Sequence, residues 1–208
     1  MANILVGLHS SSSDHAEVTG VLDALAGKIA SAGTSRDGGN DAILRMTEVE
    51  LSMALWGFYG LSCDKRSVRD FLRTINTNLE IRNAVSSSNK NLTYLPPDEA
   101  QNAASSASSG AKSLAQRSPL QPLVFTGGNQ LAPAIGGLRK MSNTYEEVEA
   151  TIKHINNAFS KSVNLNEQNI ANILYALQSI ENVNSDQINI FLEKMLLCIG
   201  NFTGNIYT

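Results

Sequence analysis

The histidine, cysteine and acidic side chains of this sequence are not spaced for catalysis. His9, His15 and His154 stand at none of the intervals from a Cys, Asp or Glu that a metal site requires, and no HExxH motif occurs. The sequence also has no GxSxG nucleophile elbow, Walker loop or GxGxxG turn. Gly127 and Gly128 precede a predicted helix start, where backbone N–H groups can bind an anion, but a lead-in to the helix is the simpler explanation. We therefore expect a non-enzymatic protein without a metal, a cofactor or a small-molecule substrate.

One cluster of carboxylates suggests paired acids. Glu146, Glu147 and Glu149 lie close together in the sequence, where a second helix of a repeated unit is predicted to begin. Acidic side chains at a helix start interact favourably with the helix dipole. We expect these three residues to form a solvated first turn.

A further set of side chains has the spacing of a recognition surface. An eleven-residue segment recurs from Met1, Leu51, Leu131 and Ile170, and its third, sixth and ninth positions vary between the copies. Residues three apart share one face of a helix, and stacked repeats align such faces into a ladder that reads an extended ligand. The ladder comprises Asn3, Val6 and His9; Met53, Trp56 and Tyr59; Pro133, Gly136 and Arg139; and Asn172, Tyr175 and Gln178. We predict that the ladder is a partner-binding face. Packing of Trp56 and Tyr175 between neighbouring units is the alternative for the sixth position.

The uniform positions of the same segment predict the helices that carry the ladder. Positions one, five and eight are apolar in every copy, and a second apolar set at i, i+4, i+7 and i+11 follows each copy, as on one stripe of an α-helix. A helix–turn–helix unit that recurs about every 40–50 residues is the signature of a solenoid. We expect an all-α fold in one domain, an α-solenoid of four to five such repeats forming a right-handed superhelix. The clear repeats cover about 1–30, 46–82, 126–160 and 165–200.

Local signals indicate where the first helices begin. Thr47 followed by Glu50 is typical of a capping box, and Asn166 and Thr126 hold the matching places in two other copies. We expect these three residues to be N-caps.

Position seven of the segment is always small: Gly7, Gly57, Gly137 or Ala176. Glycine inside a helix is about 1 kcal/mol less favourable than alanine. Its recurrence therefore predicts that a neighbouring helix approaches closely at this position.

Residues 83–122 interrupt the repeat. Residues 97–107 resemble a helix start and a first helix whose large core residues are replaced by Ala and Ser, whereas Pro119 and Pro122 do not suit a helix interior. The segment is either a degenerate repeat, which we slightly favour, or a flexible insertion. Residues 30–42 form a smaller insertion. Because Met1 aligns with a core position, we expect a fragment of a longer repeat protein or a divergent terminal repeat.

Composition restricts the cellular setting. The chain has 208 residues, of which 42% are hydrophobic, and a formal net charge of −3. A basic n-region followed by an apolar h-region, as in a signal peptide, is not visible, and no run approaches the roughly 20 apolar residues of a membrane span. Cys63 and Cys198 form neither a CxxC pair nor a disulfide framework, so we expect two free, buried thiols. A cytoplasmic protein is predicted, or one delivered into a host cytosol.

Residues 51–58 and 170–177 resemble the octotricopeptide repeat. Both read Leu or Ile, then Ala or Ser, any residue, Ala or Ile, Leu, Trp or Tyr, Gly or Ala, and Phe or Leu. The same pattern is similar to degenerate helical-pair repeats in effector proteins of intracellular and plant-associated bacteria. Octotricopeptide proteins bind RNA in organelles, so the resemblance implies a first helix that faces RNA.

The charge of the chain favours a protein partner over RNA. Phosphate neutralisation supplies most of the non-specific affinity for nucleic acids. The sequence pI is about 5.6, and Arg139 and Lys140 are the only basic residues near the ladder. We predict a non-enzymatic interaction scaffold that binds a protein partner through the ladder, with RNA binding as the alternative.

Overall fold

The computed structural model describes residues 2–32, 46–92, 121–180 and 185–203. In these residues the chain is mostly helical with one small sheet, so the predicted all-α class is confirmed at that level. The helices are α1 (Ala2–Val6), α2 (Ala16–Ala32), α4 (Glu48–Trp56), α5 (Arg66–Leu92), α7 (Gly128–Gly136), α8 (Glu146–Ala158), α9 (Glu167–Gln178) and α10 (Asp186–Thr203). The strands are β1 (Phe125–Gly127) and β2 (Phe159–Asn164).

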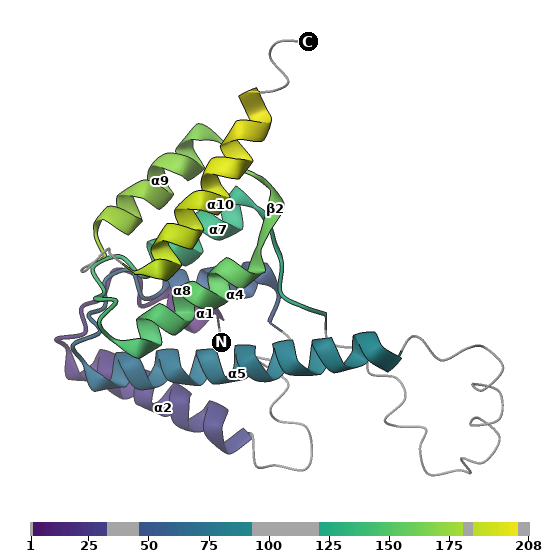
Figure 1. Ribbon diagram of the computed structural model, residues 1–208. Coiled ribbons are helices and arrows are strands. Elements are labelled where there is room, and N and C mark those ends of the chain that lie inside the picture. The colour runs from purple at the N-terminus through teal and green to yellow at the C-terminus, as the bar shows by residue number, and fades with distance from the viewer. Residues whose placement is uncertain (1, 33–45, 93–120, 181–184, 204–208) are drawn as a thin grey trace, which may run out of the picture.

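The helices lie in two rows (Figure 1). Helices α1, α4, α7 and α9 contact one another in that order, and we call them the first-helix row. Helices α2, α5, α8 and α10 contact one another in the same way and form the second-helix row. Each helix of the first row is followed in the chain by a helix of the second row, so the chain alternates between the two.

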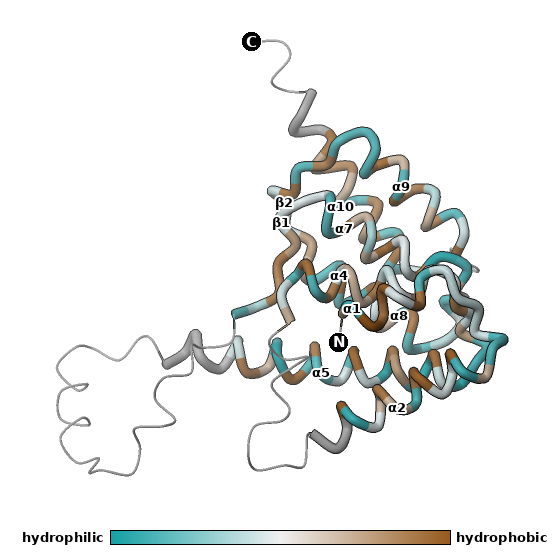
Figure 2. Tube along the Cα trace, turned by 180° about the vertical axis from the view of Figure 1, so that it is seen from behind, coloured by the Kyte–Doolittle hydropathy of each residue, from teal (hydrophilic) through white to brown (hydrophobic). Residues whose placement is uncertain are grey.

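The hydrophobic core is built from the predicted apolar stripes. Leu5, Leu55 and Ile135, at position five of three first helices, are 1% exposed or less. Figure 2 shows hydrophilic and hydrophobic bands alternating along α5 and α9, as expected of helices with one buried side. The buried residues of the second-helix stripes are Val18, Leu22, Ile29, Val68, Leu72, Ile75, Leu79, Val148, Ile152, Ile155, Ile188 and Met195.

Two predicted core positions are exposed. Ile4 on α1 is 52% exposed and Leu174 on α9 is 45% exposed. Helices α1 and α9 are the outer described members of the first-helix row, each packed in that row against one neighbour. In the interior of the row, a second neighbouring helix would cover these two side chains.

The parallel pairing of β1 with β2 was not predicted. Phe159, expected to continue the stripe of α8, lies instead at the C-cap in extended conformation (φ −71°, ψ 108°) and begins β2. It pairs with Phe125, and both rings are buried. Ser, Asn and Val follow Phe159, and because these residues favour helices weakly, the chain leaves the helix while keeping its apolar contact.

The predicted caps are correct at two of three sites. Thr47 and Asn166 both form capping boxes, with Glu50 and Asn169 respectively. Thr126 is not an N-cap, because it lies in β1 and Gly127 precedes α7 without a side-chain cap. Thr126 lies between the two residues that pair with β2, and its N–H donates to Gln130 Oε1 at 3.4 Å.

The predicted ends of the repeats beside the two insertions differ from the observed ends of the helices. Helix α5 continues past residue 82 to Leu92, and α2 continues past residue 30 to Ala32. The degenerate repeat expected at 97–107 and most of the smaller insertion lie outside the described residues. Across the described part of the chain, none of the helices has the length and apolarity needed to cross a bilayer.

Candidate functional site

Close backbone contacts set the spacing of the first-helix row. A Cβ on Gly57 would lie 2.2 Å from the carbonyl oxygen of Leu5 on α1, and a Cβ on Gly137 would lie 1.8 Å from that of Leu55 on α4. Both glycines have ordinary helical φ values, −59° and −66°, that any residue can adopt. The close approach is therefore what requires glycine here, as the recurrence of small residues at position seven predicts.

The turns that follow the first helices are also joined to one another. Each begins with the same local bond: Ser12 Oγ, Ser62 Oγ and Ser142 Oγ accept from the backbone N–H two residues later, at 3.2, 3.2 and 3.4 Å. The N–H of Ser62 donates to Ser13 Oγ at 3.0 Å, and the N–H of Ser142 donates to Cys63 Sγ at 3.1 Å. The two bonds join matching positions of successive units and so hold the ends of the first helices side by side.

At these aligned ends, ladder side chains of positions six and nine contact one another across helices. The His9 ring stacks on Trp56 and on Tyr59, with centroids 4.9 and 5.1 Å apart. The Arg139 guanidinium lies over the Tyr59 ring at 5.0 Å and over the Tyr175 ring at 4.4 Å. It donates from Nη1 to the hydroxyl of Tyr59 and from Nη2 to that of Tyr175, the latter at 2.6 Å. The result is a continuous row from α1 to α9.

The backbone next to Arg139 is fixed by a separate contact. Lys140 has a positive φ of 64°, a strained conformation for a non-glycine residue. Its N–H donates to the carbonyl of Ser179 at 3.0 Å, which ties the end of α7 to the end of α9. This link holds the Arg139 backbone in place between the two tyrosines.

A pocket of about 610 Å³ opens beside this row, between α4, α7 and α9. Its walls are aromatic, amide-bearing and small side chains, with one charged residue. The lining residues are Trp56, Tyr59, Tyr175; Asn129, Asn166, Gln168, Asn169, Asn172; Ala132, Pro133, Gly136, Ala176; and Arg139. Trp56 lies against Gly136, where a Cβ would come within 2.7 Å of Cζ3 of the indole. Gly136, at position six of its copy of the segment, therefore makes room for Trp56, at position six of the preceding copy.

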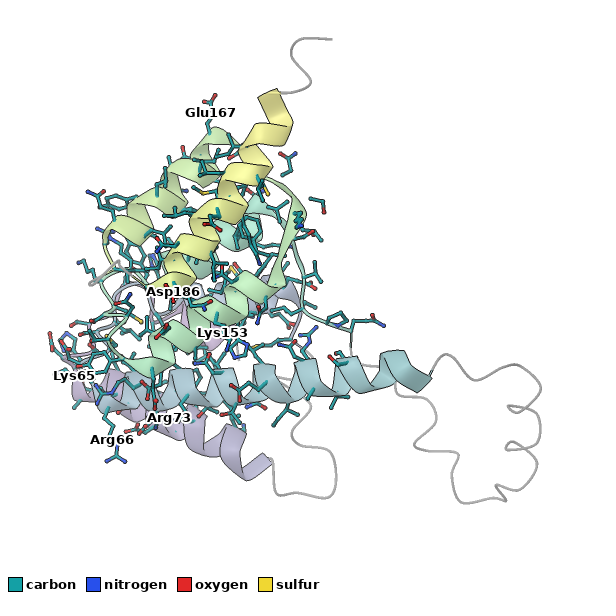
Figure 3. All side chains as sticks on the ribbon, in the orientation of Figure 1. Lys65, Arg66, Arg73, Lys153, Glu167 and Asp186 are labelled. Atoms are coloured by element: carbon teal, nitrogen blue, oxygen red, sulfur yellow. The ribbon has the colours of Figure 1, made fainter. Side chains whose placement is uncertain are left out.

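The pocket carries a positive charge that no described residue neutralises. No carboxylate of the described residues forms an ion pair with Arg139, and no Asp or Glu lines the pocket. Arg139 Nε is buried and has no hydrogen-bond partner among those residues. Figure 3 shows the labelled charged residues elsewhere: Arg66 and Glu167 point outward near opposite ends of the molecule.

Most of the predicted ladder meets at this pocket. Trp56, Tyr59, Pro133, Gly136, Arg139, Asn172 and Tyr175 all line it. His9 does not line it but stacks on two residues that do. Asn3 is exposed and Val6 half-buried on α1, Met53 is 37% exposed on α4, and Gln178 is exposed at the end of α9. The alternative for the sixth position is packing between neighbouring units. The half-buried Trp56, which lies against Gly136, fits that alternative, but Tyr175, which is 53% exposed, does not.

Sequence reasoning missed the amides at the other side of the pocket. Asn129 and Gln168 lie four residues before Pro133 and Asn172, the third positions of their copies. Residues four apart share a helix face. Extending the ladder one turn toward the N-terminus of each helix would have identified both residues.

The other chemically reactive residues lie elsewhere. In the described ranges no group of three His, Cys, Asp or Glu side chains is placed to hold a metal. His15 is exposed ahead of α2, while Cys63 and Cys198 are free and buried, and burial raises the pKa of the Cys198 thiol. The expected solvated turn is wrong for Glu147, which is 5% exposed and pairs with Arg73 of α5.

The arrangement is suited to binding. Aromatic faces, amide groups and a guanidinium without a carboxylate partner among the described residues converge on one concave surface, which is the usual composition of a recognition site. Comparison with family models, with curated proteins and with solved structures finds no match for this chain.

Proposed function

We propose that the protein is an interaction scaffold that binds an extended segment of a partner protein in the pocket between α4, α7 and α9. In this proposal the two rows of helices are an α-solenoid of the kind that the octotricopeptide resemblance implies. The recurring contacts support it, since Gly57 packs on Leu5 as Gly137 packs on Leu55. The shared turn geometry and the bonds between successive turns support it as well.

The observation that carries the proposal is the convergence of the variable positions on one pocket. Residues that differ from copy to copy, among them Trp56, Arg139 and Tyr175, lie around the same space of about 610 Å³. In repeat proteins the scaffold is uniform and the binding residues vary. The convergence is what a recognition surface requires and what core packing does not.

The chemistry of the walls suits a polypeptide. Asn and Gln amides offer both a donor and an acceptor, which are the groups that an extended backbone needs. Asn172 accepts from Gln168 at 2.9 Å through its oxygen, and its NH₂ group donates to no described residue. Aromatic rings such as those of Trp56 and Tyr175 supply apolar contact area and are enriched where proteins bind one another.

Charge pairing favours a protein over RNA. Of the basic residues labelled in Figure 3, Lys65, Arg66 and Arg73 lie near the start of α5 and away from the first-helix row, and Lys153 lies on α8. Acids pair with the first three: Asp14 with Lys65 at 3.2 Å, and Asp70 with Arg66 at 3.2 Å and with Arg73 at 2.6 Å. An RNA-binding face needs several unpaired cations to replace counterions.

The test is capture of a partner through the pocket itself. Asn172→p-benzoylphenylalanine places a photo-crosslinker at the exposed pocket wall, and the crosslinked peptide is identified by mass spectrometry with and without RNase. Tyr175→Ala should abolish the crosslink. Leu197→Ala removes an apolar side chain of similar exposure, 59% against 53%, on α10 outside the pocket and should leave it intact.

Other results would speak against the proposal. A crosslink to RNA, or one that RNase removes, would make RNA the ligand. Equal crosslinking by the Tyr175→Ala and Leu197→Ala proteins would show that the pocket is not the binding site. Matching unfolding midpoints of the two variants exclude loss of fold as the reason for a difference.

A further inference from the structure

We propose that the pocket selects a carboxylate, carried by an acidic side chain of the bound segment and held by Arg139. This inference rests on the proposed function, because it assumes that a protein segment enters the pocket. The inference adds that the bound segment presents an acidic residue to the pocket.

Arg139 differs from the other described arginines in its hydrogen-bond partners. Arg66 and Arg73 pair with Asp70, and Arg73 also with Glu147. Arg69 donates to the backbone carbonyls of Cys63 and Asp64, and Arg82 to those of Gln121 and Met46. The described partners of Arg139 are two phenol oxygens, which are neutral. Its charge is therefore uncompensated inside a concave site, where the dielectric screening is weaker than in water.

The guanidinium is held between two tyrosines with N–H donors left over. Rings of Tyr59 and Tyr175 lie against it at 5.0 and 4.4 Å, and their hydroxyls accept from Nη1 and Nη2. A guanidinium has five N–H donors, of which these two bonds use two. A side chain fixed in this way loses little conformational entropy when an anion binds, and Arg binds carboxylates through two parallel hydrogen bonds.

The tyrosine hydroxyls extend the same preference. Each accepts a hydrogen bond from Arg139, so its own hydrogen is left to donate to an incoming oxygen. No acidic residue lines the pocket to repel the anion. The amides of Asn129 and Asn172 stand on α7 and α9, where they can pair with the backbone on either side of the acidic residue. Charge, donors and flanking amides thus specify an acidic residue within an extended segment.

The chain supplies its own probe for the test. Trp56 is the only tryptophan of the sequence and lines the pocket, so its fluorescence reports binding there. The full chain is titrated with three peptides: acetyl-Ala-Ala-Glu-Ala-Ala-amide, the same peptide with Gln in place of Glu, and acetyl-Ala-Ala-Ala-Ala-Ala with a free C-terminal carboxylate. We expect the Glu peptide to bind about tenfold more tightly than the Gln peptide, as for a charge-assisted hydrogen bond. Raising the salt concentration should reduce that preference.

Arg139→Gln should reduce the preference to about one, whereas Arg66→Gln, outside the pocket, should preserve it. Arg139→Lys keeps the charge but loses the two-pronged geometry, so an intermediate preference is expected. If the Arg139 variants do not fold, the Glu-to-Gln ratio of the unmodified protein and its salt dependence still decide the question.

The remaining outcomes separate the two proposals. Equal binding of the Glu and Gln peptides would overturn the carboxylate inference and leave the proposed peptide-binding function standing. Tighter binding of the free-acid peptide than of the Glu peptide would assign the site to a chain terminus and overturn the acidic side chain. If no peptide changes the fluorescence of Trp56 and the crosslink at Asn172 also fails, both proposals are wrong.

Discussion

Gly137 packs directly on the backbone carbonyl of Leu55, so closely that a Cβ would lie 1.8 Å from the oxygen. The same relationship joins Gly57 to Leu5 one interface earlier, at 2.2 Å. In both cases position seven of one unit contacts position five of the preceding unit. The spacing between neighbouring first helices is therefore set by backbone contact, and the pocket between α4, α7 and α9 depends on that spacing.

Gly137→Ala should destabilise the fold by about 1–3 kcal/mol, the usual effect of forcing extra volume into a packed interface. The added methyl group meets backbone atoms of Leu55 and Trp56, which cannot rotate away as a side chain can. Urea unfolding followed by circular dichroism measures the change in the free energy of unfolding.

Gly27→Ala is the matched control for Gly137→Ala. Gly27 lies within α2, and a Cβ there meets nothing within 4 Å. The substitution should stabilise the protein by about 0.5–1 kcal/mol, because alanine is the better helix former. A loss of stability as large as that of Gly137→Ala would show that the effect comes from the helix and not from the interface.

Gly136→Ala should displace the indole of Trp56 and leave the fold largely intact. A Cβ there would lie 2.7 Å from Cζ3 and 3.1 Å from Cε3 of the indole, which belong to a half-buried side chain that can move. We expect a red shift of the tryptophan emission as the ring moves toward water. The loss in stability should be smaller, by about 1 kcal/mol or more, than that of Gly137→Ala. An unchanged emission spectrum would contradict the packing of Trp56 on Gly136.

The features of this fold that depend on periodicity could be predicted from the sequence. Apolar spacing located the two rows of helices, and the small residues of position seven indicated close approach, as Gly57 and Gly137 show. The variable positions indicated most of the pocket. The helices and the close approach could be predicted because helix periodicity determines which residues share a face, whatever lies beyond it, whereas the ladder as a partner-binding face stays a prediction.

Features that depend on tertiary contact could not be predicted in the same way. Phe159 fits a helical stripe in the sequence, but pairing with Phe125 places it in a strand. Glu147 has the sequence signal of a solvated helix start, and only the position of Arg73, far away in the chain, explains its burial. Leu174 matches the core positions of the other copies, yet its exposure depends on how many neighbours its helix has.

The pair of Arg73 with Glu147 supplies a further prediction. Glu147 is 5% exposed, and the backbone carbonyl of the same residue accepts from Asn76 at 2.8 Å, so α5 and α8 are joined at this point. Arg73→Met leaves a buried carboxylate without its ion pair and should destabilise the protein by about 1–2 kcal/mol, less than a fully buried pair because Arg73 is half-exposed. Urea unfolding of both single variants and the double variant with Glu147→Gln gives the coupling energy.

Arg66→Met serves as the control for this pair. Arg66 also pairs with Asp70, but its side chain is 86% exposed. A solvated pair of this kind contributes about 0–1 kcal/mol, so the variant should unfold almost as the unmodified protein does. Equal losses for Arg66→Met and Arg73→Met would argue against any special role for the buried carboxylate.

His154 predicts how the stability of the fold depends on pH. Burial of this side chain of α8 lowers its pKa, the nearby Glu80 carboxylate of α5, 3.9 Å from Nε2, raises it by less, and Lys153 lowers it further. The folded protein therefore keeps His154 neutral where the unfolded chain, with an ordinary histidine pKa of about 6.5, already binds a proton. The stabilising contribution is complete above about pH 6.5 and is lost as the pH falls through the lowered pKa of the folded state.

His154→Leu should remove this dependence and reduce the pH slope of the free energy of unfolding by up to about 1.4 kcal/mol per pH unit below neutrality. Urea titrations between about pH 7 and pH 5 measure the slope, and His15→Leu, which removes an exposed histidine, should leave it nearly unchanged. An identical slope for the unmodified and His154→Leu proteins would show that protonation of His154 does not oppose folding.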